Sequence, residues 1–428
     1  MSLSQKDILN ISSKKPEDEA ALALIETRRD AMIEQTIEWA KINTGSWNAD
    51  GLQTFAPILQ EALSQLGAEV VSHPTKPIEK INDQGEKTYF QSGPVFTVTA
   101  RPEAPVKIIF TGHYDTVFPP GTFEEITDIG DGKLNGPGLA DMKGGIVVML
   151  EAIKAFEAGP HKSKLGYSIV LSPDEETGNF ASAPFIAEAA KDAHIGLTFE
   201  PSMESGAMSG ARKGSAIYDF IFKGRASHAG RAPEAGRSAL LAAAEFALGI
   251  EKLDAAMDTV TFNVGAIDGG NAVNIVPDNA VLRLGIRAPN QTLADLAVRS
   301  LETLMKKVLQ RDGITAEMVG SFYRPPKPRN AAQSELFEAA AATAHVIGQS
   351  LTFQDTGGVC EGNNVFNAGT PNIDTLGVRG GSIHSPDEFV VLDSFTERAG
   401  LTALLLNRLA DGRIDAAHIK SLMKEDQD

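Results

Sequence analysis

The sequence predicts an α/β protein in which helices cover a mixed β-sheet and a smaller α+β unit is inserted into the chain. Helix-like and strand-like segments alternate up to about position 200, and two strand and helix units follow. A proline-containing segment at 323–328 then leads back to helix-like runs. The 428 residues, 42% hydrophobic and 22% charged, suffice for two domains.

The helices and strands of the larger unit are predicted from the spacing of apolar residues along the sequence. Short apolar runs indicate buried strands, and longer runs with helical spacing indicate helices. We expect strands near 69–73, 94–100, 106–112, 167–172, 195–199 and 372–377, and helices over 17–44, 53–66, 144–158, 333–348 and 394–411.

The inserted unit has a different order of elements. We expect strands at 216–223, 259–267, 280–287 and 314–320, and helices near 237–253 and 292–311. Two successive strand and helix units of this kind predict a small ferredoxin-like α+β fold. We therefore place one discontinuous domain at 1–211 and 325–428, and the inserted domain at 212–324.

Five residues of metal-ligand type each end a strand or occupy a loop. The set comprises two imidazoles and three carboxylates, which suits zinc or a similar divalent ion. Strand ends matter because ligands of α/β sheets gather at the carboxyl edge. The residues are His113, Asp141, Glu176, Glu200 and His384.

Each position also has an ordinary explanation when taken alone. His113 could be a hydrogen-bonded histidine at a strand end, and Asp141 could cap the following helix. Glu176 ends a run of three acids that could form a solvated turn. The repeated placement of these residues after apolar strands favours a metal site.

The motifs around these residues resemble those of a known enzyme family. They are GHYDTV (112–117), GLADMKGG (138–145), DEETG (174–178), EP (200–201), ASHAG (226–230) and HS (384–385). In this order they resemble the co-catalytic metallopeptidases of the acetylornithine deacetylase, succinyl-diaminopimelate desuccinylase and carboxypeptidase G family, and within it the glutamate carboxypeptidases.

The resemblance implies a role for each matched residue. Asp141 would bridge two divalent ions, with His113 and Glu200 completing one shell, and Glu176 and His384 the other. Zinc is the expected metal, and cobalt or manganese are alternatives.

The resemblance also implies two residues that assist the metals. Glu175 would be the general base, and Asp115 would steady the His113 ring. A non-proline cis peptide is implied after Asp141.

The resemblance further implies four residues for the substrate. His228 would act across a dimer formed by the inserted lid domain, while Asn274 and Arg287 would hold a free carboxylate. Gly358 would present backbone groups to the substrate. The stretch that follows departs from the usual Thr-Asp-Ala pattern and contains Cys360, for which we favour a buried core position.

Composition excludes several other classes. The formal net charge of -17 argues against nucleic-acid binding. The sequence contains no apolar stretch near 18 residues and no leader-like beginning, so we expect no membrane association and a cytoplasmic location. A single cysteine excludes an intramolecular disulfide.

These observations predict a dinuclear zinc hydrolase that cleaves the amide next to a free C-terminal carboxylate. Its substrate would be a small peptide or an N-acyl amino acid, and it would act as a homodimer. An N-acyl amino acid deacylase is the alternative within enzymes, since it would share every catalytic residue. A non-catalytic carboxylate-binding protein ranks far lower because no ligand position is lost.

Overall fold

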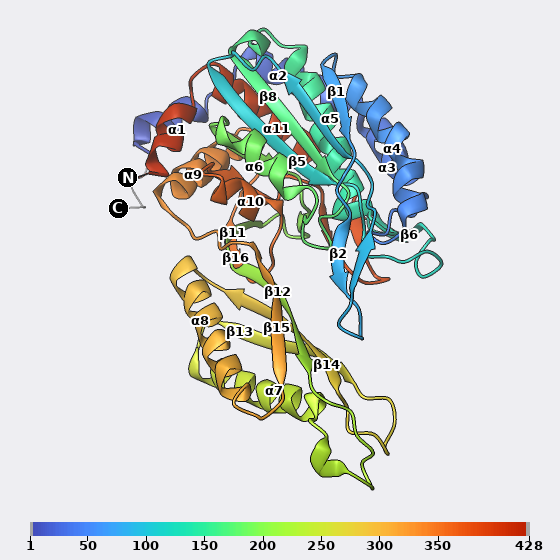
Figure 1. The fold of residues 1–428 in the computed structure, drawn as a ribbon. Helices are drawn as coiled ribbons and strands as arrows, with labels where there is room; N and C mark the ends of the chain where they lie inside the picture. The colour runs from blue at the N-terminus through green and yellow to red at the C-terminus, as the bar shows by residue number, and fades with distance from the viewer. Residues whose placement is uncertain (1–2, 425–428) are drawn as a thin grey trace.

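The computed structural model describes residues 3–424 and contains a large and a small unit, each with its own sheet and hydrophobic core (Figure 1). The main sheet has the strand order β1-β4-β8-β5-β9-β17. Its β5, β8, β9 and β17 run parallel, while β1 and β4 are antiparallel to their neighbours. The six strands are β1 (Glu69–His73), β4 (Val95–Ala100), β5 (Val106–His113), β8 (Leu165–Ser172), β9 (Ile195–Thr198) and β17 (Asn372–Ile373).

Helices cover both faces of this mixed sheet. Ile108 and Phe110 of β5 belong to the core that includes α5 and α11, whereas Ile109 belongs to a smaller core with α6 and α10. This alternation follows from the two-residue period of a strand. The helices of the large unit are α1 (Gln5–Ile11), α2 (Pro16–Glu26), α3 (Arg29–Ala40), α4 (Ala49–Ser64), α5 (Gly144–Glu157), α6 (Ala183–Lys191), α9 (Ala331–His345), α10 (Glu361–Asn367), α11 (Ser394–Ala410) and α12 (Ala416–Leu422).

A second sheet of the large unit has the order β10-β18-β19-β7-β6. Because its short strands come from distant parts of the chain, it joins the segment that follows β7 to the loop between β18 and β19. Its members are β6 (Thr127–Gly130), β7 (Lys133–Asn135), β10 (Ser202–Met203), β18 (Arg379–Gly381) and β19 (Phe389–Val391).

The small unit has the order β-α-β-β-α-β along the chain and the strand order β13-β14-β12-β15 in space. This is the ferredoxin-like arrangement that the sequence predicts. The helices α7 and α8 pack against its sheet around one core. The elements are β12 (Gly214–Lys223), α7 (Ala239–Ala256), β13 (Thr261–Gly269), β14 (Asn279–Ala288), α8 (Gln291–Val308) and β15 (Thr315–Arg324).

The two connections between the units are buried and bound to one carboxylate. Arg212, which ends β11 (Met208–Arg212), exchanges backbone hydrogen bonds of 2.9 and 3.0 Å with Lys327. Arg212 Nε and Lys327 Nζ each donate to Asp374 Oδ2 at 2.7 Å. Neighbouring β16 (Phe353–Thr356) pairs with β11. Asp374 therefore fixes the point at which the chain leaves and re-enters the large unit.

A hairpin of the large unit makes a second contact with the small one. It comprises β2 (Ile78–Ile81) and β3 (Lys87–Phe90), and it projects toward β14 (Figure 1). Ile81 packs with three aliphatic side chains of the small sheet, and Asp83 Oδ1 accepts a hydrogen bond of 2.8 Å from Arg283. The hairpin thus binds the small unit at a site separate from the connections.

The expected fold class is confirmed, and several element predictions are wrong in detail. The helix expected over 17–44 is divided into α2 and α3 at residues 27 and 28. The strand expected at 314–320 continues through Tyr323 and Arg324, because Arg324 pairs with Ser215, so these two residues are not part of a linker. The strand expected at 372–377 has only two residues. No helix among residues 3–424 is long and apolar enough to cross a membrane.

Candidate active site

Three of the expected ligands lie at, or shortly after, the carboxyl ends of neighbouring parallel strands. His113 is the last residue of β5, Glu176 follows β8, and Glu200 follows β9. Since β8, β5 and β9 lie side by side and run parallel, their carboxyl ends share one edge of the sheet. The sheet topology therefore brings these three side chains together.

The second sheet supplies the other two expected ligands. Asp141 follows β7, and His384 lies between β18 and β19, which belong to the same sheet. The peptide bond between Asp141 and Met142 is cis, as the resemblance implies. The backbone N–H groups of Ala140 and Asp141 donate to Glu388 Oε1 at 3.0 and 3.1 Å. Glu388 thereby holds the Asp141 loop.

The five side chains form two groups that share Asp141. One group contains His113, Asp141 and Glu200, and the other contains Asp141, Glu176 and His384, with potential ligand atoms within 4.8 Å of one another in each. Asp141 Oδ1 lies 3.2 Å from His113 Nε2, and Asp141 Oδ2 lies 3.2 Å from His384 Nε2. Each oxygen of Asp141 thus faces one histidine, as expected of a carboxylate between two cations.

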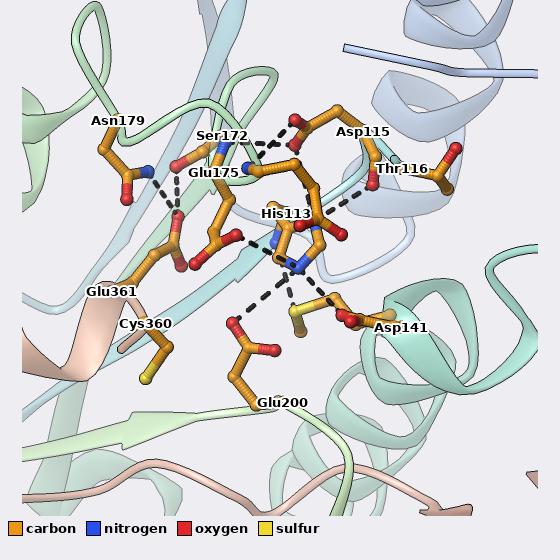
Figure 2. A network of polar contacts seen from close by, with 12 residues as sticks. His113, Asp115, Thr116, Asp141, Ser172, Glu175, Asn179, Glu200, Cys360 and Glu361 are labelled. Atoms are coloured by element: carbon orange, nitrogen blue, oxygen red, sulfur yellow. Dashed lines mark hydrogen bonds and ion pairs between the residues drawn. The ribbon is translucent and has the colours of Figure 1, made fainter. Parts of the chain in front are cut away.

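Asp115 supports both sides of this arrangement. His113 Nδ1 lies 3.0 Å from the Asp115 carbonyl oxygen and 3.3 Å from Asp115 Oδ1. The Asp115 carboxylate accepts hydrogen bonds from the backbone N–H groups of Glu175 and Glu176, and from Ser46 Oγ at 2.7 Å. Figure 2 shows Asp115, Glu175, Asp141 and Glu200 around the His113 ring. Asp115 therefore fixes the ring and the acidic turn together.

Glu175 lies beside these groups and is bound by a buried arginine. Arg324 Nη2 lies 2.7 Å from Glu175 Oε1 and donates to the Glu175 carbonyl and to Asn179 Oδ1, at 2.6 Å each. The other oxygen, Glu175 Oε2, lies 4.0 Å from His113 Nε2. One oxygen of Glu175 is thus held by Arg324, and the other faces the histidine of the first group.

The electrostatics of the described residues fit a site for cations. Burial and the neighbouring charge of Asp141 raise the pKa of Glu176 to about 8, and burial, with Glu200 nearby, raises that of Glu175 to about 7. Glu200 Oε1 is buried without a hydrogen-bond partner. Buried carboxylates with free lone pairs, next to two imidazoles, are the donor set of a divalent metal site.

A pocket of about 470 Å³ opens onto these residues. Arg287 and Gly358, to which the resemblance assigns substrate binding, line it together with Arg212, Tyr323 and Arg324. Cys360 is 2% exposed, which confirms its expected burial, and it also borders the pocket.

His228 and Asn274 do not line this pocket. Both are exposed and lie in neighbouring loops of the small unit, where the Ala229 N–H donates to the Asn274 carbonyl at 2.9 Å. Within one chain, the structure does not bring them to the metal-ligand groups.

Three buried residues near the pocket were missed by sequence reasoning. Arg324 was assigned to a linker, and Glu388 and Glu361 were not considered. Glu361 Oε1 accepts from Ser172 Oγ and from Asn179 Nδ2, and burial raises the pKa of Glu361 to about 8. Only Glu388 had a local signal, because it lies four residues after His384 in the same loop.

Comparisons with known proteins agree with this geometry. The sequence profile described as peptidase family M20/M25/M40 matches residues 109–408. This chain belongs to peptidase family M20/M25/M40. It is therefore a hydrolase of the metallopeptidase and amidohydrolase class, as predicted, and the two groups around Asp141 fit the two-metal requirement typical of the family.

Relatives within the M20/M25/M40 family differ in activity. The chain is 28% identical over 396 residues to carboxypeptidase G2 of Pseudomonas sp. (strain RS-16), covering 90% of each sequence. It is 25% identical over 328 residues to a succinyl-diaminopimelate desuccinylase of Hahella chejuensis, covering 72% of this chain and 83% of the relative. The fold is similar to that of an M20 metallo-carboxypeptidase from Sulfolobus solfataricus, with a TM-score of 0.68 at 18% identity over 89% of this chain and 99% of the other.

Proposed function

We propose that this protein is a dinuclear zinc hydrolase that cleaves the amide bond next to a free C-terminal carboxylate. The observation that carries the proposal is the shared position of Asp141 between two ligand groups, with Glu175 beside them and Arg287 in the same pocket. The similarity to carboxypeptidase G2 supports the carboxypeptidase type of activity.

In this proposal, two divalent ions would be held by the two groups that share Asp141, one ion with His113 and Glu200, and the other with Glu176 and His384. The bound metals would supply Lewis acidity toward the scissile carbonyl and lower the pKa of the attacking water. Asp115 would orient His113 through its contacts with the ring nitrogen.

Glu175 would act as the general base and then as the general acid. Its carboxylate would take a proton from water and deliver it to the departing amine. Arg324 holds one oxygen at 2.7 Å, which leaves the other oxygen facing the ligand groups. A carboxylate fixed at one oxygen transfers protons from a defined position, which lowers the entropic cost of the reaction.

Arg287 would bind the free carboxylate of the substrate. A guanidinium donates two parallel hydrogen bonds to a carboxylate, and Arg287 is a partly buried residue at the wall of the pocket. An acidic chain would otherwise repel an anionic substrate, since its net charge is -17. Gly358, which lies after β16 and lines the same pocket, would contribute backbone groups.

We also propose that the domain at 212–324 forms a homodimer. Its edge strand β13 and its helix α7 line an apolar groove of about 520 Å³, and Leu241 and Leu248 of α7 are 59% and 61% exposed. A second copy would cover these side chains. In such a dimer, the exposed His228 and Asn274 of one protomer could contact the catalytic pocket of its partner, which they do not line within their own chain.

The first experiment measures metal content per chain by plasma emission. It is paired with hydrolysis of N-acyl and dipeptidyl substrates that differ only at the C-terminal residue. We expect close to two metal ions per chain and a strong preference for particular C-terminal residues of the substrate. Absence of bound metal after zinc or cobalt reconstitution, together with no hydrolysis, would refute the proposal.

The same substrate panel distinguishes a carboxypeptidase-type hydrolase from an N-acyl amino acid deacylase. A preference set by the acyl group, with indifference to the C-terminal residue, would favour the deacylase activity suggested by the desuccinylase relatives. The cytoplasmic location and the domain boundaries stay predictions.

A further inference from the structure

We infer that Asn179 and Glu361 are positioning residues for the reaction, because they hold Arg324 against Glu175. This inference deepens the proposed function and rests on it. Glu175 acts from a defined position only if the long arginine side chain beside it is itself fixed. Asn179 and Glu361 are both 0% exposed, and neither belongs to the two ligand groups around Asp141.

Three oxygen atoms surround Nη2 of Arg324. They are Glu175 Oε1 at 2.7 Å, the Glu175 carbonyl oxygen at 2.6 Å and Asn179 Oδ1 at 2.6 Å. Arg324 is 4% exposed, so its side chain exchanges few of these contacts for water. Two of the three oxygens belong to Glu175 itself. The contact with Asn179 therefore fixes Nη2 independently of the residue that it has to position.

The side-chain amide of Asn179 has one possible orientation. A guanidinium only donates hydrogen bonds, so the atom that faces Arg324 is the oxygen, and Nδ2 faces the other way. There Nδ2 donates to Glu361 Oε1 at 3.2 Å and to Ser182 Oγ at 2.9 Å. The Ser182 hydroxyl donates its own proton to Asp174, which leaves its oxygen free to accept. Both ends of the amide are therefore held.

Glu361 anchors this amide from the first residue of α10. Its Oε1 accepts hydrogen bonds from Asn179 Nδ2 and from Ser172 Oγ, and Figure 2 shows both groups directed at this oxygen. Ser172 is the last residue of β8, the strand that precedes the turn with Glu175. The anchor therefore joins α10 to the strand on which the acidic turn is built.

The backbone of the acidic turn places Asn179 for this contact. Its φ of +56° is a left-handed conformation, which asparagine tolerates better than most residues with a side chain. Its N–H donates to the Asp174 carbonyl at 2.8 Å, and the Gly178 N–H donates to the Glu175 carbonyl at 2.9 Å. These bonds close the turn, so that Asn179 lies beside both Glu175 and Arg324.

The contact joins the two units at the proposed base. Arg324 belongs to β15 of the small unit, whereas Asn179 and Glu361 belong to the large unit. Without the Asn179 oxygen, Nη2 would keep only Glu175 among its present partners, and the guanidinium and the carboxylate would move together. A carboxylate that moves spends less time at the distance needed for proton transfer. Loss of Asn179 should therefore lower kcat and leave the carboxylate site at Arg287 unchanged.

The test measures kcat, KM and metal content for Asn179→Gly with the substrate that the C-terminal panel identifies. Glycine adopts a φ of +56° without strain, so this variant removes the side chain alone. We expect kcat to fall about 10- to 100-fold and KM to change by less than about twofold, with the metal content unchanged. Asn364→Ala is the matched control and should keep the native kcat, because Asn364 Oδ1 has no hydrogen-bond partner among the described residues.

Two comparisons show whether Asn179 acts through Arg324. Glu361→Gln keeps an acceptor at Oε1 and should retain most of the native kcat, whereas Glu361→Leu removes the acceptor and should resemble Asn179→Gly. In an Arg324→Met background, Asn179→Gly should lower kcat by less than about threefold, because the contact that it supports is already lost. The Glu361 pair decides the question if Arg324→Met does not fold.

The outcomes separate the positioning role from the proposed function. The positioning role alone would be overturned by a kcat of Asn179→Gly within about twofold of native, or by a loss of activity that follows a loss of metal. Equal kcat values for Glu361→Gln and Glu361→Leu would also overturn it, as would a full further loss in the Arg324→Met background. No hydrolysis by the metal-loaded native enzyme would refute the proposed function, and the positioning role with it.

Discussion

Replacement of Asp374 by asparagine tests whether the buried cluster at the domain connections stabilises the fold. Asp374 and Lys327 are 0% exposed, and Arg212 is 8% exposed. Burial opposes ionisation of Asp374, but the charges of Arg212 and Lys327 outweigh it and lower its pKa. Asp374→Asn would leave two buried cations without a counter-ion. The expected loss in the free energy of unfolding is about 3–5 kcal/mol.

The size of this loss should depend on pH. Burial lowers the pKa of Lys327 even with Asp374 present, and removal of the carboxylate should lower it further. The pKa of a lysine in the unfolded chain is near 10.4. At pH values between the lowered pKa of Lys327 in the folded variant and about 10.4, the unfolded variant therefore binds more protons than the folded one. The stability of the variant relative to the native protein should therefore rise as pH increases toward about 10.

Urea unfolding between pH 6 and 10 measures both effects. The signal is the tryptophan fluorescence of the buried Trp39 and the partly exposed Trp47, checked against far-UV circular dichroism for a single transition. Asp312→Asn is the matched control, since Asp312 pairs with Arg237 but its side chain is 83% exposed, and it should change stability by about 0–1 kcal/mol. A loss for Asp374→Asn no larger than that of the control, with no pH dependence, would refute the reasoning.

Three further predictions concern the candidate active site. Glu175→Gln should lower kcat by about 10²–10⁴-fold and leave the metal content by plasma emission unchanged, whereas near-native turnover would exclude its role as base. Arg287→Ala should raise KM for the carboxylate substrate without loss of metal, and Arg287→Lys should restore only part of the affinity because an ammonium lacks the planar fork. Glu388→Ala should weaken metal binding by about 10–100-fold in a chelator competition, with Glu388→Gln closer to native, since Glu388 holds the Asp141 loop; equal affinities would contradict this.

The ligand positions could be predicted from the sequence because strand ends are local signals. An apolar run followed by His113, or by Glu200, indicates the carboxyl end of a buried strand, and parallel strands bring such ends together. The motif order then identified the family. A local pattern of this kind cannot predict the role of Arg324, because its contact with Glu175 joins residues 149 positions apart. Its neighbouring prolines instead suggested a linker, although pairing with Ser215 extends the strand.

The hairpin of β2 and β3 had a signal that the sequence prediction did not use. Its turn at 82–85 reads Asn-Asp-Gln-Gly and lies between two short runs, which is typical of a hairpin loop. The local pattern could not predict that the hairpin contacts the small sheet. The contact of Ile81 depends on the relative placement of the two units, which is a tertiary property.

The small unit forms part of the active-site wall and is not an independent module. Its strands carry Arg287, Ser215 and Arg324 in one row, and Arg324 binds the proposed base directly. A rotation of the small sheet would therefore displace both the proposed carboxylate site and the Arg324 side chain that holds Glu175. Asp374 at the connections and the hairpin at Arg283 oppose that rotation from two separate places. Loss of Asp374 should consequently lower kcat/KM as well as stability, even though Asp374 lies outside the ligand groups.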